Sequence, residues 1–115
     1  MCLDKVDVKP TISGKGKGWK VFHQWVEREL SPLFFSHLHE LFEIGEWVED
    51  TNQNDGLGYP VGFHLFANEE DAMRYATRHH YWVVYCVEFD EVVTTGWQQN
   101  AKVIVARKVK VLPNE

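Results

Sequence analysis

The segment between residues 81 and 112 most strongly constrains the fold, because two long stretches of strand-forming residues follow one another there. The run YWVVYCVEFDEVV (81–93) is almost continuously aromatic, apolar or β-branched, which predicts a central strand covered on both faces. After a turn region at residues 94–100, AKVIVARKVKVL (101–112) alternates valines with lysines, as a half-exposed strand does. A chain with two such strands is built around a sheet.

The stretch that precedes these strands predicts a strand and then the main helix. VGFHLFA (61–67) follows Tyr59-Pro60 and has strand character, and Asn68 stands at the N-cap position of a helix with three acids in its first turn. Apolar residues recur at helical spacing after these acids. We expect residues 59–80 to be mainly scaffold, with five side chains in the core: Phe63, Leu65, Ala72, Tyr75 and Ala76.

The sequence of the N-terminal half leaves some elements open between two structures. GWKVFHQW (18–25) predicts a strand, whereas VEREL (26–30) fits either a hairpin extension or a helical turn. Residues 33–50 predict a short turn or helix near Ser36 and a strand after Gly45, and residues 51–58 predict a loop. Residues 1–17 predict a flexible lead-in. The fold class is therefore α+β: a single domain over residues 18–112, with a mostly antiparallel sheet and one main helix.

Length and composition support one small domain. A chain of 115 residues with 44% hydrophobic residues can bury a single core. Its apolar runs are far shorter than the roughly 20 residues that span a bilayer, and acids near the start argue against a signal peptide, so we expect a cytoplasmic protein without a membrane partner. Cys2 and Cys86 lie far apart and are expected to be reduced thiols. The compact size, acidic balance and aromatic richness resemble small accessory proteins of bacteria and their phages.

The histidines invite a metal hypothesis, but their spacing argues against it. SHLHE supplies His37, His39 and Glu40 within four residues. In a helix the two imidazoles point about 200° apart, and in a strand the carboxylate turns away from both. Zinc sites need three or four convergent ligands. We expect a fold without metal.

Charge is distributed unevenly along the chain. Between Glu29 and Met73 there is no Lys or Arg, while ten acids fall in that window and the net charge is −5. This acidic middle is either a solvated face or a docking surface for a protein partner. Direct nucleic-acid binding is not expected, because the acids repel phosphates. The candidate partner contacts cluster beside one tryptophan and a loop: Glu43, Glu46, Trp47, Glu49 and Asp50.

Three short patterns together resemble the core of the ADP-ribosyltransferases. GFHLFA is similar to that family's G-(I/F)-Y-F-(A/S) strand, EEDAMRYA to its Tyr-containing helix, and WVVYCVEF to its next strand. WKVFH would then be the family's first strand, which maps the histidine that contacts the nicotinamide ribose onto His23. The resemblance covers about half of the chain and implies NAD as a cofactor.

The departures from this pattern predict a catalytically degenerate relative. His64 stands where the family has a tyrosine that stacks on nicotinamide. Asn100 or Ala101 stands near the start of the last strand, where active enzymes have a glutamate. Without that carboxylate nothing stabilises a developing oxocarbenium charge.

The sequence therefore predicts a small binding domain rather than an enzyme. Its macromolecular partner meets the acidic middle, or a small ligand meets the region around His23, His64 and Trp97. No catalytic residue and no cofactor are assigned. The alternative is an NAD-dependent enzyme similar to ADP-ribosyltransferases.

Overall fold

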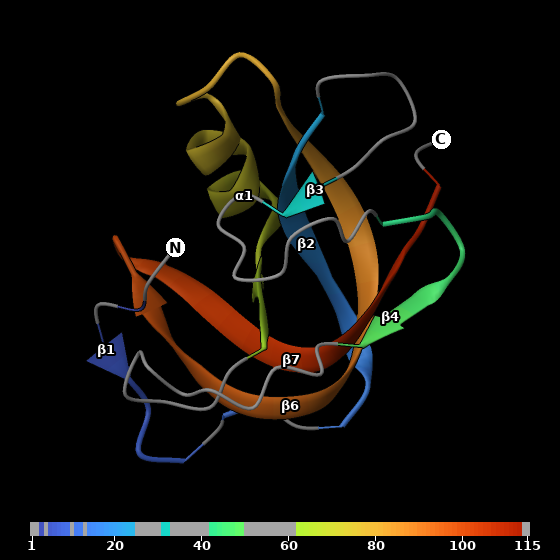
Figure 1. Ribbon diagram of the computed structural model, residues 1–115. Helices are drawn as coiled ribbons and strands as arrows, with labels where there is room; N and C mark the ends of the chain where they lie inside the picture. The colour runs from blue at the N-terminus through green and yellow to red at the C-terminus, as the bar shows by residue number, and fades with distance from the viewer. Residues whose placement is uncertain are drawn as a thin grey trace.

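The fold is organised around a long curved hairpin, drawn in orange and red in Figure 1. β6 (Trp82–Gln98) and β7 (Ala101–Val111) pair in antiparallel register from Val87↔Val111 to Gln98↔Ala101. The computed structural model describes residues 3, 5–9, 11–12, 14–24, 31–32, 42–49 and 62–113, with the backbone alone at 31–32.

The connection between β6 and β7 is shorter than the sequence indicated. Gln99 and Asn100 both have positive φ, 51° and 67°, as the tightest hairpin turns require, and asparagine tolerates this conformation. The turn region expected at 94–100 is wrong in its extent, because β6 continues to Gln98. Pairing with β7 imposes strand structure on residues 94–98, where local propensity is weak.

The sheet closes on itself. β2 (Gly16–His23) pairs with β6 in antiparallel register, and β5 (Phe63–Phe66) pairs with β7. β2 and β5 meet at one register position, Trp19↔Phe66. Within this set of four strands, each strand therefore pairs with two of the other three. A register shift between Val92 and Thr94 accompanies the bend of β6.

Short strands extend this closed sheet at its margins. β1 (Lys5–Val6) pairs with β6, β3 (Ser31–Pro32) with β2, and β4 (Trp47–Glu49) with β7. All the named strand pairs are antiparallel. The expected single domain with a mostly antiparallel sheet and one helix is confirmed for the described residues, as is a strand after Gly45. The expected turn or helix near Ser36 and the loop at 51–58 lie outside the described residues.

The helix lies against the outside of the sheet. α1 (Glu69–Ala76) follows Asn68, which occupies the N-cap position with extended backbone. Its side chain makes no capping hydrogen bond and donates instead from Nδ2 to Asp71 Oδ2 at 3.4 Å. The helix residues Ala72 and Tyr75 are buried between α1 and the sheet, in one cluster with Phe66 and Val103.

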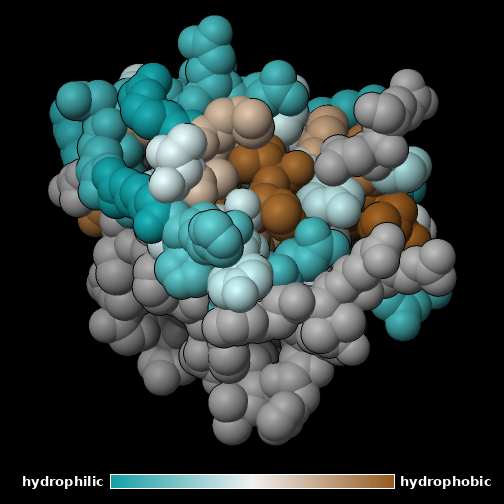
Figure 2. Space-filling view, turned by 90° about the horizontal axis from the view of Figure 1, so that it is seen from above, coloured by the Kyte–Doolittle hydropathy of each residue, from teal (hydrophilic) through white to brown (hydrophobic). Residues whose placement is uncertain are grey.

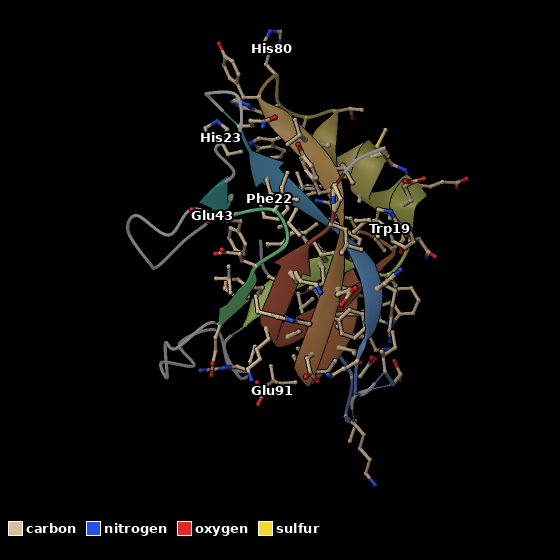
Figure 3. The ribbon with its side chains drawn as sticks, turned by 90° about the vertical axis from the view of Figure 1, so that its right-hand side faces the viewer. Trp19, Phe22, His23, Glu43, His80 and Glu91 are labelled. Carbon is tan, nitrogen blue, oxygen red and sulfur yellow. The ribbon has the colours of Figure 1, made fainter. Side chains whose placement is uncertain are left out.

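The second core cluster fills the interior of the closed sheet. Phe22, Phe42, Phe63 and Leu65 are buried there together with residues of β6 and β7. Figure 3 shows Phe22 in the middle of the molecule, Trp19 on the side of α1 and Glu43 on the other side. Four of the five side chains expected in the core are buried, whereas Ala76 is half-buried.

The first five residues of β6 are less covered than expected. Trp82 to Cys86 are all half-buried, so this part of the apolar run is not a central strand sealed on both faces. The first buried residue of β6 is Val87, where β6 comes to lie between β2 and β7.

Residues 6 and 7 contact the sheet, whereas the flexible lead-in expected for residues 1–17 stays a prediction. Val6 pairs with Gly96, and Lys102 Nζ donates to Asp7 Oδ2 at 2.6 Å. Thr95 Oγ1 donates to the same oxygen at 2.6 Å. These partners lie about ninety residues away in the chain, so no local sequence pattern predicts that β1 and Asp7 contact β6 and β7.

Candidate functional site

The three residues predicted to bind a small ligand lie apart. His23 ends β2 opposite Trp82, at the start of β6, whereas Trp97 lies one residue before the end of β6. His64 lies in β5 opposite Val105. The structure therefore does not gather His23, His64 and Trp97 into one site.

His64 lies beside a buried lysine. Lys20 Nζ donates to the backbone oxygen of His64 at 2.9 Å, and its ammonium lies 5.6 Å and 5.7 Å from the ring centroids of Phe22 and Phe63. Burial, followed by the positive charge of Lys20, lowers the pKa of His64 to about 3. The imidazole is therefore neutral at physiological pH and supplies no charge to an anionic ligand.

A cluster of rings surrounds His23, and sequence reasoning missed it. The rings of Tyr75 and His79 each stack on Trp82 with centroids 5.3 Å apart. His23 meets His79 edge-on at 5.5 Å, and burial followed by the charge of His79 lowers the pKa of His23. The run of aromatic and histidine residues in RHHYW (78–82) was the sequence pattern that could have indicated this cluster. Figure 2 looks onto this end of the molecule and shows apolar surface between hydrophilic side chains.

Candidate metal ligands in this cluster are known only for the part of the chain that the structure describes. No three His, Cys, Asp or Glu side chains converge there in a metal-binding arrangement. His37, His39 and Glu40 lie outside the described residues, so the sequence expectation about them stays a prediction.

Four of the five predicted partner contacts are exposed, in β4 and in the residues just before it. Glu43, Glu46 and Glu49 are exposed, and Trp47 keeps 43% of its surface accessible. Ile44, which sequence reasoning did not select, is 46% exposed. Val48, between Trp47 and Glu49 in β4, is half-buried and packs on the interior core. Because successive side chains of a strand point to opposite faces, Trp47 and Glu49 point outward. We call these exposed residues the acidic edge: Glu43, Ile44, Glu46, Trp47 and Glu49. Asp50 lies outside the described residues.

Two lysines of β7 lie next to the acidic edge. The Lys110 ammonium is 5.3 Å from the Trp47 ring centroid and 3.4 Å from Glu88 of β6. Lys108 lies 3.3 Å from Glu91, whose hydrogen bond and charge, followed by the charge of Glu49, raise the pKa of Lys108. β4, a part of the acidic middle of the sequence, therefore pairs with the basic end of β7, which linear charge counting could not reveal.

The acidic edge nevertheless keeps an excess of carboxylates. Lys108 and Lys110 are engaged by carboxylates of β6. Within the described part of the chain no basic side chain forms an ion pair with Glu43 or Glu46. Exposed charges of this kind attract a cationic partner over roughly 10 Å at moderate salt.

Comparison with known proteins identifies no relative of this chain. No protein-family model, no curated protein and no solved structure matches this chain significantly. A functional assignment therefore depends on the shape, charge and chemistry of the surface.

Proposed function

We propose that this protein is a small binding module whose acidic edge receives a basic segment of a protein partner. One observation carries the proposal. Two large apolar side chains, Ile44 and Trp47, are left more than 40% exposed within seven residues that also expose three carboxylates. An exposed aromatic anchor surrounded by charge is the usual composition of a protein-binding surface.

The two kinds of side chain have different tasks. Glu43 and Glu46 raise the rate of encounter with a cation-rich partner, because the attraction acts before contact. Trp47 supplies affinity once water is excluded from its ring. The Lys110 ammonium already lies 5.3 Å from this ring, and the exposed part of Trp47 offers the same cation–π contact to a lysine or arginine of the partner.

The NAD-dependent alternative has less support. Asn100 lies in the turn between β6 and β7 with φ of 67°, and Ala101 is buried at the start of β7. Neither position provides a carboxylate for transfer chemistry, and the neutral His64 does not replace one. NAD remains a cofactor of that alternative alone.

The setting of the module is proposed from the sequence. No helix in the described residues has the length and apolar character needed to cross a membrane. We place the protein in the cytoplasm as an accessory protein of a bacterium or phage, with no direct contact to nucleic acid.

Selection from a random-peptide library tests the proposal. The library is selected on the wild-type protein and, separately, on the double variant Glu43→Lys, Glu46→Lys. We expect peptides enriched in lysine and arginine on the wild type, with affinity at least about tenfold weaker for the double variant. The matched control is Glu69→Lys, Glu70→Lys, which makes the same charge change on exposed residues of α1. Peptides that are not basic, or that bind both double variants equally, would refute the proposal.

A further inference from the structure

A second exposed aromatic strip lies around β1 and carries the opposite charge. Lys5 and Lys9 are exposed, Val8 is fully exposed, and Val6 and Trp97 are 40% and 41% exposed. Lys5 lies opposite Trp97 across the β1–β6 pair. We call this strip the basic edge: Lys5, Val6, Val8, Lys9 and Trp97.

Asp7, the acid described beside this strip, is already paired with a lysine of β7. Asp7 Oδ2 accepts hydrogen bonds at 2.6 Å from both Lys102 Nζ and Thr95 Oγ1, and the Asp7 and Lys102 side chains are each 14% exposed. The hydrogen bond from Lys102, followed by that from Thr95, holds the pKa of Asp7 below its usual range. This pair connects the residue that follows β1 to the hairpin, and among the described residues of this strip Lys5 and Lys9 are the exposed charges.

The basic and acidic edges lie near opposite ends of the β6–β7 hairpin. β1 pairs with β6 at Gly96 and Trp97, close to the hairpin turn, whereas β4 pairs with β7 at residues 108–110, close to the end of β7. Figure 1 shows β1 and β4 on opposite sides of the molecule. One chain therefore presents complementary surfaces that face in different directions.

We propose that a second copy of this chain is a partner of the acidic edge, with the basic edge of one copy docked on the acidic edge of the next. This inference rests on the proposed function, because it uses the same acidic edge. Lys5 and Lys9 of one copy meet Glu43 and Glu46 of the next, and the ring of Trp47 packs on the exposed valines. The valines and lysines of the basic edge provide both the apolar and the cationic chemistry that the acidic edge requires.

The contact is head-to-tail rather than symmetric. Each copy uses two different surfaces, so association continues into a ring or a chain of copies instead of stopping at a dimer. β1 has two residues and β4 has three, so each contact is small. Small charged contacts are weak and depend on salt.

Sedimentation velocity of the full chain tests this inference. Samples span about 10 µM to about 500 µM, the range in which a small interface associates, at ionic strengths of about 0.02 M and 0.5 M. We expect the weight-average sedimentation coefficient to rise with concentration at low salt and to stay near the monomer value at high salt.

Two charge-reversed variants test the head-to-tail geometry. The first is Glu43→Lys, Glu46→Lys, and the second is Lys5→Glu, Lys9→Glu. Each alone should remain monomeric at low salt. Their equimolar mixture should associate, because the intact basic edge of the first meets the intact acidic edge of the second. The variant Glu69→Lys, Glu70→Lys should associate like the wild type.

The outcomes separate this inference from the proposed function. A wild-type protein that stays monomeric at every concentration, or a mixture that fails to associate, overturns the self-association. If basic peptides still bind the acidic edge in that case, the proposed function stands with another partner. Loss of peptide binding together with monomeric wild type overturns both.

Discussion

Replacing Phe63 by alanine is expected to lower the free energy of unfolding by about 3–5 kcal/mol, the usual cost of truncating a buried phenylalanine. Phe63 is 6% exposed, and its ring meets Phe42 edge-on with centroids 5.2 Å apart. It lies in the interior cluster together with Phe22 and Leu65, so truncation leaves a cavity that its neighbours cannot readily fill. The total free energy of unfolding of a small domain is about 5–15 kcal/mol, so this substitution would remove a large fraction of the stability.

Urea denaturation followed by far-ultraviolet circular dichroism measures this loss. Met73→Ala is the matched control, because Met73 is 55% exposed on α1 and its truncation removes little buried surface. If Phe63→Ala and Met73→Ala unfold at the same urea concentration, residues 63–66 are not part of the core and the scaffold interpretation of this stretch fails.

The stability of the protein is expected to decrease as the pH falls from 6.5 toward 5, chiefly because of His64. In the folded state burial and the charge of Lys20 lower the pKa of His64 to about 3, whereas the ordinary value is 6.5. Between these two values the unfolded chain binds a proton that the folded chain does not. The stabilising contribution of the neutral imidazole is therefore complete above pH 6.5 and is lost progressively below it.

The slope of this loss approaches about 1.4 kcal/mol per pH unit, which gives roughly 2 kcal/mol between pH 6.5 and 5. Urea titrations of the wild type and of His64→Gln at several pH values measure it. The variant should lose this contribution and keep the acid sensitivity that the lowered pKa of His23 contributes. Identical slopes for the two proteins, or an NMR titration in which His64 takes up a proton near pH 6.5, would contradict the assignment.

Elements with a strong local signal could be predicted from the sequence. The alternating valines of β7, the acids after Asn68 and the short apolar run at 63–66 each determine their structure within a few residues, and the structure contains all three elements. Burial could also be predicted from the local pattern, because Phe63 and Leu65 stand two residues apart in a strand and both face the interior.

Features that depend on distant pairing could not be predicted in this way. Lys5–Val6 is too short to give a strand signal and is held by Asp7, which contacts Thr95 and Lys102 far along the chain. The placement of Lys108 and Lys110 beside the acidic edge results from the pairing of β4 with β7. Linear charge counting identified exposed acids but not their neighbours.

The association rate of a selected basic peptide with the acidic edge is the measurement that tests the central claim most directly. Stopped-flow tryptophan fluorescence at low and high salt compares the wild type with Glu43→Lys, Glu46→Lys and with Trp47→Ala. Trp97→Ala is the control for loss of a tryptophan, because Trp97 belongs to the basic edge and is similarly exposed.

We predict that the double charge reversal slows association about tenfold or more at low salt and removes most of the salt dependence. Trp47→Ala should chiefly accelerate dissociation, whereas Trp97→Ala should leave both rates unchanged. If the folded double variant binds the peptide at the wild-type rate across ionic strengths, the acidic edge is only a solvated surface and the binding function proposed for it is wrong.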